Sequence, residues 1–348
     1  MQKRFVTIHD VAADAKVSTA TVSRALNEPW RVRADTIQRV HASVARLGYS
    51  PNLRARLLAR GGSGTVCFLL SNRPFVHSVH AQILQGAAQE ADELHVQMVY
   101  AACNYSHLLE PQDIQLPRIV AARGMVDGVI AAGTNYPNLL RALDELDMPH
   151  VTFGTNLVAE DDARIANAVY VDDEDGGYQA ASHLLSLGHT SIRFIGDVSL
   201  PWYRRRYLGF ARAMNQAGLD APPPAGSAAE GELAMGSGAT NELCDRGEEF
   251  TALFVGGDMG ALGALRALAN HGIHVPGQVS VVGFNDEELA QIAEPPLTTV
   301  RVPKEQIGAA CVRMLDARIR GTHADTGAVV MPAMLVMRQS TAAVVTNK

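Results

Sequence analysis

Apolar residues recur at helical spacing in three short stretches of the first fifty residues. The apolar positions are Ile8, Val11, Ala12 and Ala15 in the first stretch, Val22, Ala25 and Leu26 in the second, and Ile37, Val40, Val44 and Leu47 in the third. Thr7 and Ser18 can cap the first two helices, and Gly48 can end the third. Because only a tight turn at Lys16 and Val17 separates the first two, the pattern predicts a helix-turn-helix followed by a third helix that closes a small core.

From residue 65 onward, short apolar runs rich in β-forming residues alternate with amphipathic helical stretches. The runs cover residues 65–71, 96–101, 126–132, 150–154, 169–172, 192–196, 252–256 and 279–284. This alternation is typical of a doubly wound α/β fold with parallel sheets. Eight strands exceed what one such lobe usually holds, so we expect two lobes with a cleft between them. The chain then divides into a helical head over residues 1–50, a connecting segment over 51–64, and a two-lobed body over 65–348.

Charge separates the head from the body. The chain of 348 residues has a formal net charge of −6, but residues 1–60 carry +7 and the remainder carries −13. A basic head on an acidic body is the electrostatic footprint of a small nucleic-acid-binding module joined to a domain with another task. An ordinary solvated charged surface is the alternative, which charge alone does not exclude.

Several function classes lack their sequence signals. No apolar run of about 18 residues could cross a bilayer, and the N-terminus lacks the apolar core of a signal peptide, so we expect a cytoplasmic protein that does not bind membranes. The four cysteines form no C-x-x-C pair, which disfavours a zinc or redox site. Neither a phosphate-binding glycine loop nor an H-E-x-x-H or G-x-S-x-G motif occurs. We therefore expect no cofactor, no catalytic residues and no enzyme activity.

Sequence blocks along nearly the whole chain carry a resemblance to a known family. The blocks are residues 7–12, 17–27 and 47–52 in the head, and 126–130, 188–192, 206–210, 281–286 and 296–300 in the body. Together they resemble the lactose/galactose repressor (LacI/GalR) family of bacterial transcriptional regulators. The resemblance implies that the body forms two lobes like those of periplasmic binding proteins, with a dimer interface along them. Two positions of the head depart from the family pattern: Lys16 replaces the usual Gly, and Arg33 replaces the usual capping Ser.

The resemblance implies which head residues meet DNA. The second helix would enter the major groove, with Thr19, Ala20 and Arg24 facing base edges, and an Arg can bond guanine in bidentate fashion. Phosphate contacts would come from Thr7, Ser18, Thr21, Ser23, Asn27 and Tyr49. Helix capping is the alternative role of each hydroxyl, and Ser18 can serve both purposes.

The connecting segment has helical propensity over residues 52–60 but is too short to be a stable helix alone in water. In the family such a hinge helix orders on the operator, pairs with its dimer mate and inserts a leucine into the minor groove. The matching residues are Asn52 on DNA, Ala55 at the close helix–helix contact and Leu58 as the inserted wedge. A flexible linker leading into the glycine-rich residues 61–64 is the alternative.

The body resembles an effector-binding domain, and ligands of open α/β sheets lie beyond the carboxyl ends of the strands. Arg206 matches the family's effector-binding arginine, although an Arg in the run 204–206 could also lie on the surface. Gly257 and Asp258 stand where the family usually has Asn-Asp, and Asn285 replaces its sugar-binding Asp. We expect Gly257 to enlarge the cavity and Asn285 to repel an anion less than Asp would. The sequence therefore predicts a sugar acid or another hydroxylated anion rather than a neutral sugar.

Aromatic residues near these positions are candidates for stacking on a sugar ring. Trp202 and Tyr203 precede Arg206 closely, and Phe75 lies in the loop after the first strand. We expect Phe75 to stack on the ligand, with a core or lid position as the alternative. The effector-binding set is therefore Phe75, Trp202, Arg206, Asp258 and Asn285.

The sequence as a whole predicts a transcriptional repressor that binds a pseudo-palindromic operator as a homodimer and senses a small metabolite. The C-terminus has no leucine heptads that would assemble a tetramer. A transport solute-binding protein would share the body but needs a signal peptide and no basic head. A metabolic enzyme with a DNA-binding domain would need a catalytic motif, and an architectural DNA binder would not need a two-lobed body. Whether the effector induces or corepresses stays open.

Overall fold

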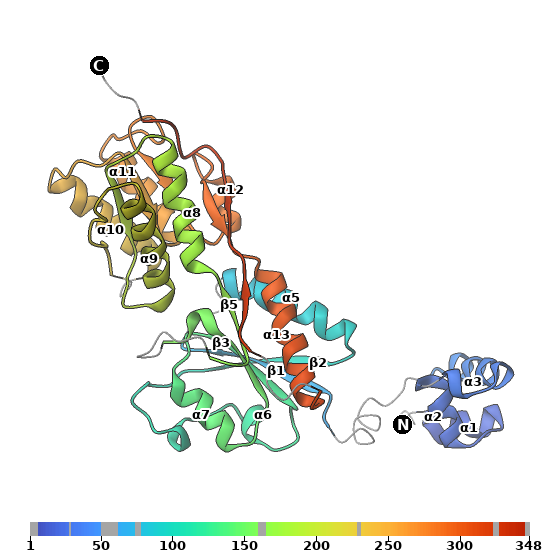
Figure 1. Cartoon of the computed structure of the whole chain (residues 1–348). Coiled ribbons are helices and arrows are strands. Elements are labelled where there is room, and N and C mark those ends of the chain that lie inside the picture. Colours follow the sequence, from blue (N-terminus) through green and yellow to red (C-terminus); the bar gives the residue numbers. More distant parts are fainter. Residues whose placement is uncertain are drawn as a thin grey trace. The chain divides into compact units, whose positions relative to one another are not determined.

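The computed structural model describes residues 6–27, 29–49, 62–73, 78–158, 165–227, 231–322 and 327–344. The chain forms two compact units, Met1–Gly64 and Thr65–Lys348 (Figure 1). The predicted hinge positions Asn52, Ala55 and Leu58 and the predicted stacking residue Phe75 lie outside the described residues. No helix in the described part of the chain is both long and apolar enough to cross a membrane.

The first unit contains the three predicted helices. They are α1 (Ile8–Ala15), α2 (Thr19–Asn27) and α3 (Ala34–Leu47), with the short helix η1 (Pro29–Arg31) between the last two. Thr7 and Asp10 form a reciprocal capping box at the start of α1. Lys16 ends α1 in the left-handed conformation, with φ 54°, so the turn keeps its shape without the usual Gly. The predicted core is confirmed, because residues of all three helices pack into one apolar cluster.

The first lobe of the body is built on a six-stranded sheet in the order β10-β5-β4-β3-β1-β2, with every neighbouring pair parallel. Its elements in chain order are β1 (Thr65–Ser71), α5 (Ser78–Glu93), β2 (Gln97–Cys103), η2 (Pro111–Asp113), α6 (Arg118–Ala121), β3 (Gly128–Gly133), α7 (Pro137–Glu145), β4 (His150–Phe153), η3 (Gly154–Asn156) and β5 (Ala168–Val171). The later elements α13 (Lys304–Ile319) and β10 (Val329–Met331) return to this lobe.

The second lobe has a three-stranded parallel sheet, β6-β7-β8, and an antiparallel pair, β9 and β11. Its elements are α8 (Asp173–Ser186), β6 (Ile192–Ile195), α9 (Pro201–Gln216), α10 (Glu232–Asp245), β7 (Ala252–Val255), α11 (Asp258–Asn270), β8 (Ser280–Val282), α12 (Glu288–Ile292), β9 (Thr299–Arg301) and β11 (Met334–Val336). All eight predicted strands are confirmed. The predictions missed the three-residue strands β9, β10 and β11, whereas β8, also of three residues, was found because it lies within the apolar run 279–284.

Burial on both faces explains why β1 reads as a continuous apolar run. In β1, Val66, Phe68 and Leu70 pack into the core that includes residues of α5 and α13. The alternate residues Cys67 and Leu69 pack into a separate core with residues of α6 and α7. Helices therefore cover both faces of the first sheet, as Figure 1 shows.

The chain passes between the lobes after β5, after β9 and between β10 and β11. A backbone hydrogen bond joins two of these crossings, because the Asp172 N–H donates to the Met331 carbonyl (2.9 Å). Within the second lobe, the Asn285 N–H in the loop after β8 donates to the Val300 carbonyl of β9 (2.8 Å). Loops that follow strands of both sheets thereby meet at the junction of the lobes, where the pocket lies.

Candidate functional sites

The exposed face of α2 carries the residues predicted to read DNA bases. Ala20 and Arg24, one helical turn apart, are both exposed, whereas Val22 and Ala25 are buried in the core of the head. Thr19 is half-buried at the start of the helix. This arrangement leaves the side of α2 with Ala20 and Arg24 open to a partner.

Two of the predicted phosphate-binding hydroxyls also cap helices. Ser18 Oγ accepts a hydrogen bond from the Thr21 N–H (3.1 Å) and lies 2.9 Å from Thr21 Oγ1. Thr7 Oγ1 accepts a hydrogen bond from the Asp10 N–H (3.4 Å) and donates to Asp10 Oδ2 (2.8 Å). Capping is therefore a role of both residues, and because both are exposed, a phosphate contact stays a prediction.

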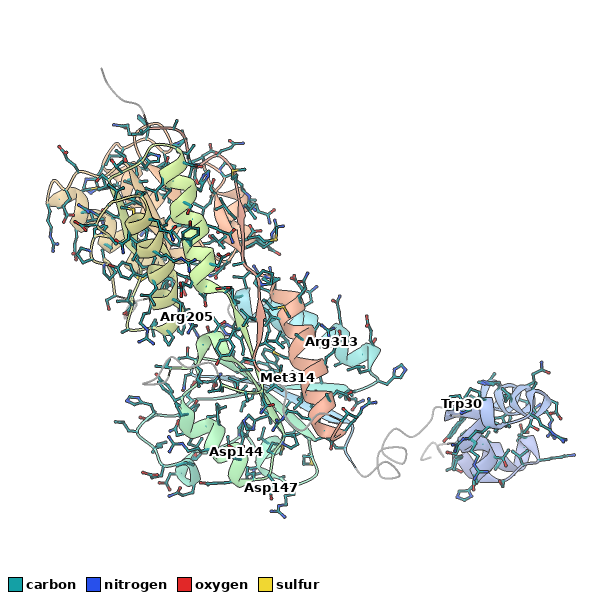
Figure 2. The ribbon with its side chains drawn as sticks, viewed as in Figure 1. Trp30, Asp144, Asp147, Arg205, Arg313 and Met314 are labelled. Carbon is teal, nitrogen blue, oxygen red and sulfur yellow. The ribbon has the colours of Figure 1, made fainter. Side chains whose placement is uncertain are left out.

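The remaining head residues differ in position. Tyr49 is only 9% exposed and belongs to the apolar core of the head, a packing role that the sequence did not predict. Ser23 is half-buried on α2, and Asn27 ends that helix with a side chain outside the described set. The predictions overlooked Trp30 on η1, which is 77% exposed (Figure 2). Its neighbour Arg31 is exposed too. An aromatic residue next to a basic one within a basic head could have marked Trp30 as a candidate contact to DNA from the sequence alone.

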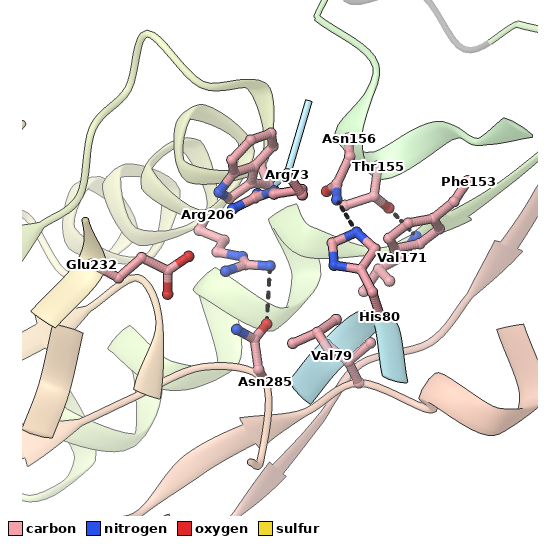
Figure 3. A pocket seen from close by; sticks show the side chains of 12 residues that line it. Arg73, Val79, His80, Phe153, Thr155, Asn156, Val171, Arg206, Glu232 and Asn285 are labelled. Carbon is pink, nitrogen blue, oxygen red and sulfur yellow. Dashed lines mark hydrogen bonds between the residues drawn. The ribbon is translucent and has the colours of Figure 1, made fainter. Parts of the chain in front are cut away.

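A pocket lies at the junction of the two lobes of the body (Figure 3). Its lining residues come from the first lobe, the second lobe and the crossing segments. They are Arg73, Val79, His80, Phe153, Thr155, Asn156, Val171, Trp202, Arg206, Glu232, Asn285 and Val302. Apolar walls with a few polar and charged groups are typical of small-molecule sites.

Arg206 makes three hydrogen bonds through its guanidinium group. Its Nε donates to Asp173 Oδ1 (2.9 Å), one terminal nitrogen donates to the Gly256 carbonyl, and the other donates to Asn285 Oδ1 (3.3 Å). The guanidinium also stacks over the Phe284 ring, 3.8 Å from its centroid. With an exposed fraction of 5%, Arg206 is not the surface residue that the run 204–206 left possible.

Close packing of α8 against α9 places Arg206 beside its partner. A Cβ atom at Gly177 on α8 would overlap the Arg206 backbone carbonyl, so only glycine allows this approach. Asp173, the first residue of α8, is fully buried and also receives Arg205 Nε at 3.4 Å. Arg205 in turn donates to the Thr155 carbonyl of the first lobe, and it lies on the side of α9 that faces that lobe (Figure 2). These hydrogen bonds and ion pairs hold Arg205 and Arg206 at the junction of the two lobes.

Asn285 is held by its backbone as well as by its side chain. Its φ of 108° lies in a region that residues other than glycine rarely adopt. The Lys304 ammonium donates to its carbonyl oxygen (2.6 Å). Since Asn285 Oδ1 accepts from Arg206, its NH₂ group is left to donate. Nδ2 lies 3.8 Å from where a Cβ would stand at Gly257.

Asp258 is not among the pocket-lining residues. It is fully buried at the start of α11, where Oδ2 accepts from the Glu287 N–H (2.7 Å) and Oδ1 accepts from the Thr299 hydroxyl (2.6 Å). Burial raises the pKa of this carboxyl to about 7, against the lowering effect of these two hydrogen bonds. In this structure Asp258 joins α11 to two neighbouring segments of the second lobe.

The structure brings together three of the five predicted effector residues, Trp202, Arg206 and Asn285. Their role as ligand contacts, like that of Asp258 and Phe75, stays a prediction. Sequence reasoning missed Arg73, His80, Thr155, Asn156 and Glu232. The first four follow the carboxyl ends of β1 and β4 or lie near the start of α5, so the strand-end rule could have found them. Glu232 had no local signal.

The space above Gly257 is bordered by polar atoms of other segments. A Cβ placed there would lie 3.2 Å from Glu232 Oε2 and 3.4 Å from the Tyr203 hydroxyl. The expectation of a simply enlarged cavity is therefore incomplete, because a carboxylate from α10 borders this space. Within the described residues, no group of three or more His, Cys, Asp or Glu side chains is arranged to hold a metal ion.

Comparison with known proteins gives matches in both units. Residues 7–52 match the family described as bacterial regulatory proteins, lacI family, and residues 181–341 match a periplasmic binding protein-like domain. The transcriptional regulator DegA of Bacillus subtilis (strain 168) is 33% identical over 338 residues, which cover 96% of this chain and 98% of DegA.

Two solved structures are similar over nearly their whole length. The Lac repressor dimer bound to operator and the anti-inducer ONPF has a TM-score of 0.76 at 27% identity, covering 98% of this chain and 100% of that one. The complex of the regulator CelR with cellobiose has a TM-score of 0.70 at 30% identity, covering 96% and 99%. The helix-turn-helix head, the two-lobed α/β body and the matches to these relatives all indicate the same family. The chain belongs to the lacI family of bacterial regulatory proteins, and it is a DNA-binding regulator of transcription rather than an enzyme.

Proposed function

We propose that this protein is a repressor whose operator affinity is controlled by a small hydroxylated metabolite, a sugar or sugar acid, bound between the two lobes. The observation that carries the proposal is the composition of the pocket. Arg73 and Asn156 come from the first lobe, and Trp202, Arg206 and Asn285 come from the second. A ligand that contacts all of them favours one arrangement of the lobes over another, which is the physical requirement for allosteric control.

The ligand class rests on the chemistry of the lining. Trp202 and Phe153 offer flat apolar surfaces for a sugar ring, and Arg206 and Asn285 offer donors for hydroxyl or carboxylate oxygens. The similar regulator CelR was solved as a complex with cellobiose, which supports a carbohydrate-like ligand.

The DNA contacts follow the exposed face of α2. We assign base reading to Thr19, Ala20 and Arg24, and positioning on phosphates to the neighbouring polar residues. Residues 1–50 then form the DNA-binding domain, 51–64 the hinge helix and linker, and 65–348 the effector-binding and dimerisation domain. A homodimer on a pseudo-palindromic operator fits the Lac repressor, which was solved as a dimer on its operator.

Operator selection with the purified full-length chain tests this proposal. Random duplex DNA is enriched on the protein, first alone and then with a panel of sugars and sugar acids. We expect one pseudo-palindrome to be enriched, its binding to weaken in Leu58→Ala and to shift with at least one ligand, in either direction. Failure to enrich any sequence would contradict the DNA-binding assignment, and a selected operator that no ligand affects would contradict the effector role.

A further inference from the structure

Two charged side chains of the pocket each contain a buried atom without a hydrogen-bond partner. These atoms are Arg73 Nε, from the loop after β1, and Glu232 Oε2, from the first residue of α10. Buried polar atoms in folded proteins nearly always have partners, and leaving charged ones unsatisfied is costly. One atom can only donate and the other can only accept. A ligand that supplies an acceptor to Arg73 and a donor to Glu232 would satisfy both.

The other pocket cation does not fill this role. Arg206 already bonds Asp173, Asn285 and the Gly256 carbonyl, so its charge is largely balanced within the protein. Arg73 contacts the Trp202 ring, with its guanidinium carbon 5.8 Å from the ring centroid. Its charge therefore faces the same space as the predicted stacking surface.

Glu232 and the Tyr203 hydroxyl border the same space above Gly257, and the charge of Glu232 acts on that hydroxyl. Burial raises the pKa of Tyr203, the charge of Glu232 raises it further, and Arg206 and Arg73 oppose this with smaller effects. The bare Gly257 backbone leaves room for the Glu232 carboxylate, since a Cβ there would stand 3.2 Å from Oε2. Figure 3 shows Glu232 directed into the pocket from the second lobe.

We propose that Glu232 and Arg73 determine the specificity and the orientation of the effector, which is a hydroxylated monocarboxylate. Its carboxylate lies at Arg73, where the charge-assisted donor is unpaired, and its hydroxyls donate to Glu232 Oε2. A second carboxylate at the Glu232 end is repelled, because it carries the same charge as Glu232 and has no hydrogen to donate to Oε2. This inference rests on the proposed effector role of the pocket. It adds a polarity, by which we mean that the carboxylate end of the ligand lies at Arg73 and the hydroxyl end at Glu232.

Calorimetric titration of the full-length chain tests the polarity with three sets of probes. The ring-forming monocarboxylates are D-glucuronate and D-galacturonate, with D-glucose and D-galactose as their neutral counterparts. The open-chain monocarboxylates are D-gluconate and D-galactonate, with D-glucarate and galactarate as their dicarboxylate counterparts. We expect the best monocarboxylate to bind about tenfold or more tightly than its neutral or dicarboxylate counterpart, the effect of one charge-assisted hydrogen bond.

Two variants separate the ends of the site. Glu232→Gln removes the anion and adds a donor, so we expect about tenfold weaker binding of the monocarboxylate and tighter binding of the dicarboxylate. Arg73→Gln is expected to bind the acid and the neutral sugar about equally. Glu242→Gln, on the same helix with a side chain that is 69% exposed, is the matched control and should behave as wild type.

The outcomes distinguish this inference from the proposal on which it rests. If a probe binds the wild-type chain and Glu232→Gln leaves the order of affinities unchanged while its thermal melting matches Glu242→Gln, the polarity is overturned but the effector role stands. Preferred binding of a neutral sugar overturns it in the same way. If none of the sugars or sugar acids binds the wild-type chain, the effector proposal is overturned as well.

Discussion

Asp173 and Arg206 form a buried ion pair at the junction of the lobes, with 2.9 Å between Oδ1 and Nε and an Asp173 side chain that is fully buried. Asp173 is the first residue of α8, where the helix dipole favours a negative charge. The pair orients the guanidinium whose terminal nitrogens bond Asn285 and Gly256. The geometry of the pocket therefore depends on a carboxylate that does not line it.

Removing this carboxylate should destabilise the protein. Asp173→Asn leaves the buried Arg206 charge uncompensated, and we expect a loss of about 3–5 kcal/mol in the free energy of unfolding. Urea denaturation followed by circular dichroism measures the loss. Glu174→Gln is the control, because Glu174 forms an exposed pair with Arg212 and should cost less than about 1 kcal/mol. Equal losses in the two variants would contradict the importance of the buried pair.

Arg206→Lys should weaken effector binding about tenfold or more while DNA binding without effector is retained. A lysine keeps the charge but cannot make the three directed bonds of the guanidinium. Anisotropy of labelled operator, titrated with effector, measures both affinities in one experiment. Arg212→Lys, more exposed on the same helix, should match wild type. An unchanged effector titration in Arg206→Lys would show that Arg206 is not a ligand contact.

Arg24→Ala should weaken binding to the selected operator by about 1–3 kcal/mol, because an exposed Arg on the reading face of α2 is predicted to bond a base. Binding to random duplex DNA should fall much less. Arg39→Ala removes the same charge from the exposed side of α3 and serves as control. Gel-shift titrations on both DNAs at fixed salt measure the ratio. A similar loss on both DNAs in Arg24→Ala would mean that Arg24 contacts phosphate instead.

The buried carboxyl of Asp258 should make stability depend on pH. Its pKa is raised from 3.8 to about 7, so the folded chain binds more protons than the unfolded chain between these values. Its contribution to the free energy of unfolding is fully present below the pKa of the unfolded chain. This contribution is lost as the pH rises through the pKa of the folded chain, with a slope of at most about 1.4 kcal/mol per pH unit. The amide of Asp258→Asn can replace the protonated carboxyl toward Thr299 and Glu287.

Denaturation of wild type and Asp258→Asn from pH 4 to 8 measures this contribution. As the pH rises, the free energy of unfolding of the wild type should fall relative to that of Asp258→Asn. Asp220→Asn, at an exposed position after α9, should keep the wild-type pH profile. Parallel profiles of wild type and Asp258→Asn would mean that Asp258 stays ionised throughout this range.

The two tryptophans should report separately on the two functions. Trp30 is 77% exposed in the head, and Trp202 is 6% exposed in the pocket. We expect Trp202→Phe to abolish the emission change caused by effector, and Trp30→Phe to abolish most of the change caused by operator. Each variant is the control of the other. Loss of the effector signal in Trp30→Phe instead would place the ligand response away from the pocket.

Local patterns in the sequence were sufficient for most of the fold. The eight predicted strands are visible as apolar runs, most clearly β1 and β3, where burial on both faces makes the run continuous. The head helices are visible because their caps and apolar stripes lie within a few residues of each other. Arg206 stood out by its place in a family block, and the pocket indeed includes it.

Tertiary structure alone decided which distant side chains meet. Glu232 and Arg73 lie on separate lobes and are brought to one pocket by the three crossings of the chain. Asp258 follows a strand end, as a ligand-binding residue would, yet Thr299 and Glu287 occupy its oxygens. Helix and strand patterns depend on neighbours a few residues away, whereas these contacts depend on how the segments pack. For that reason hydrophobic spacing predicted the elements and the resemblance of sequence blocks indicated the family, whereas packing determined which side chains line the pocket.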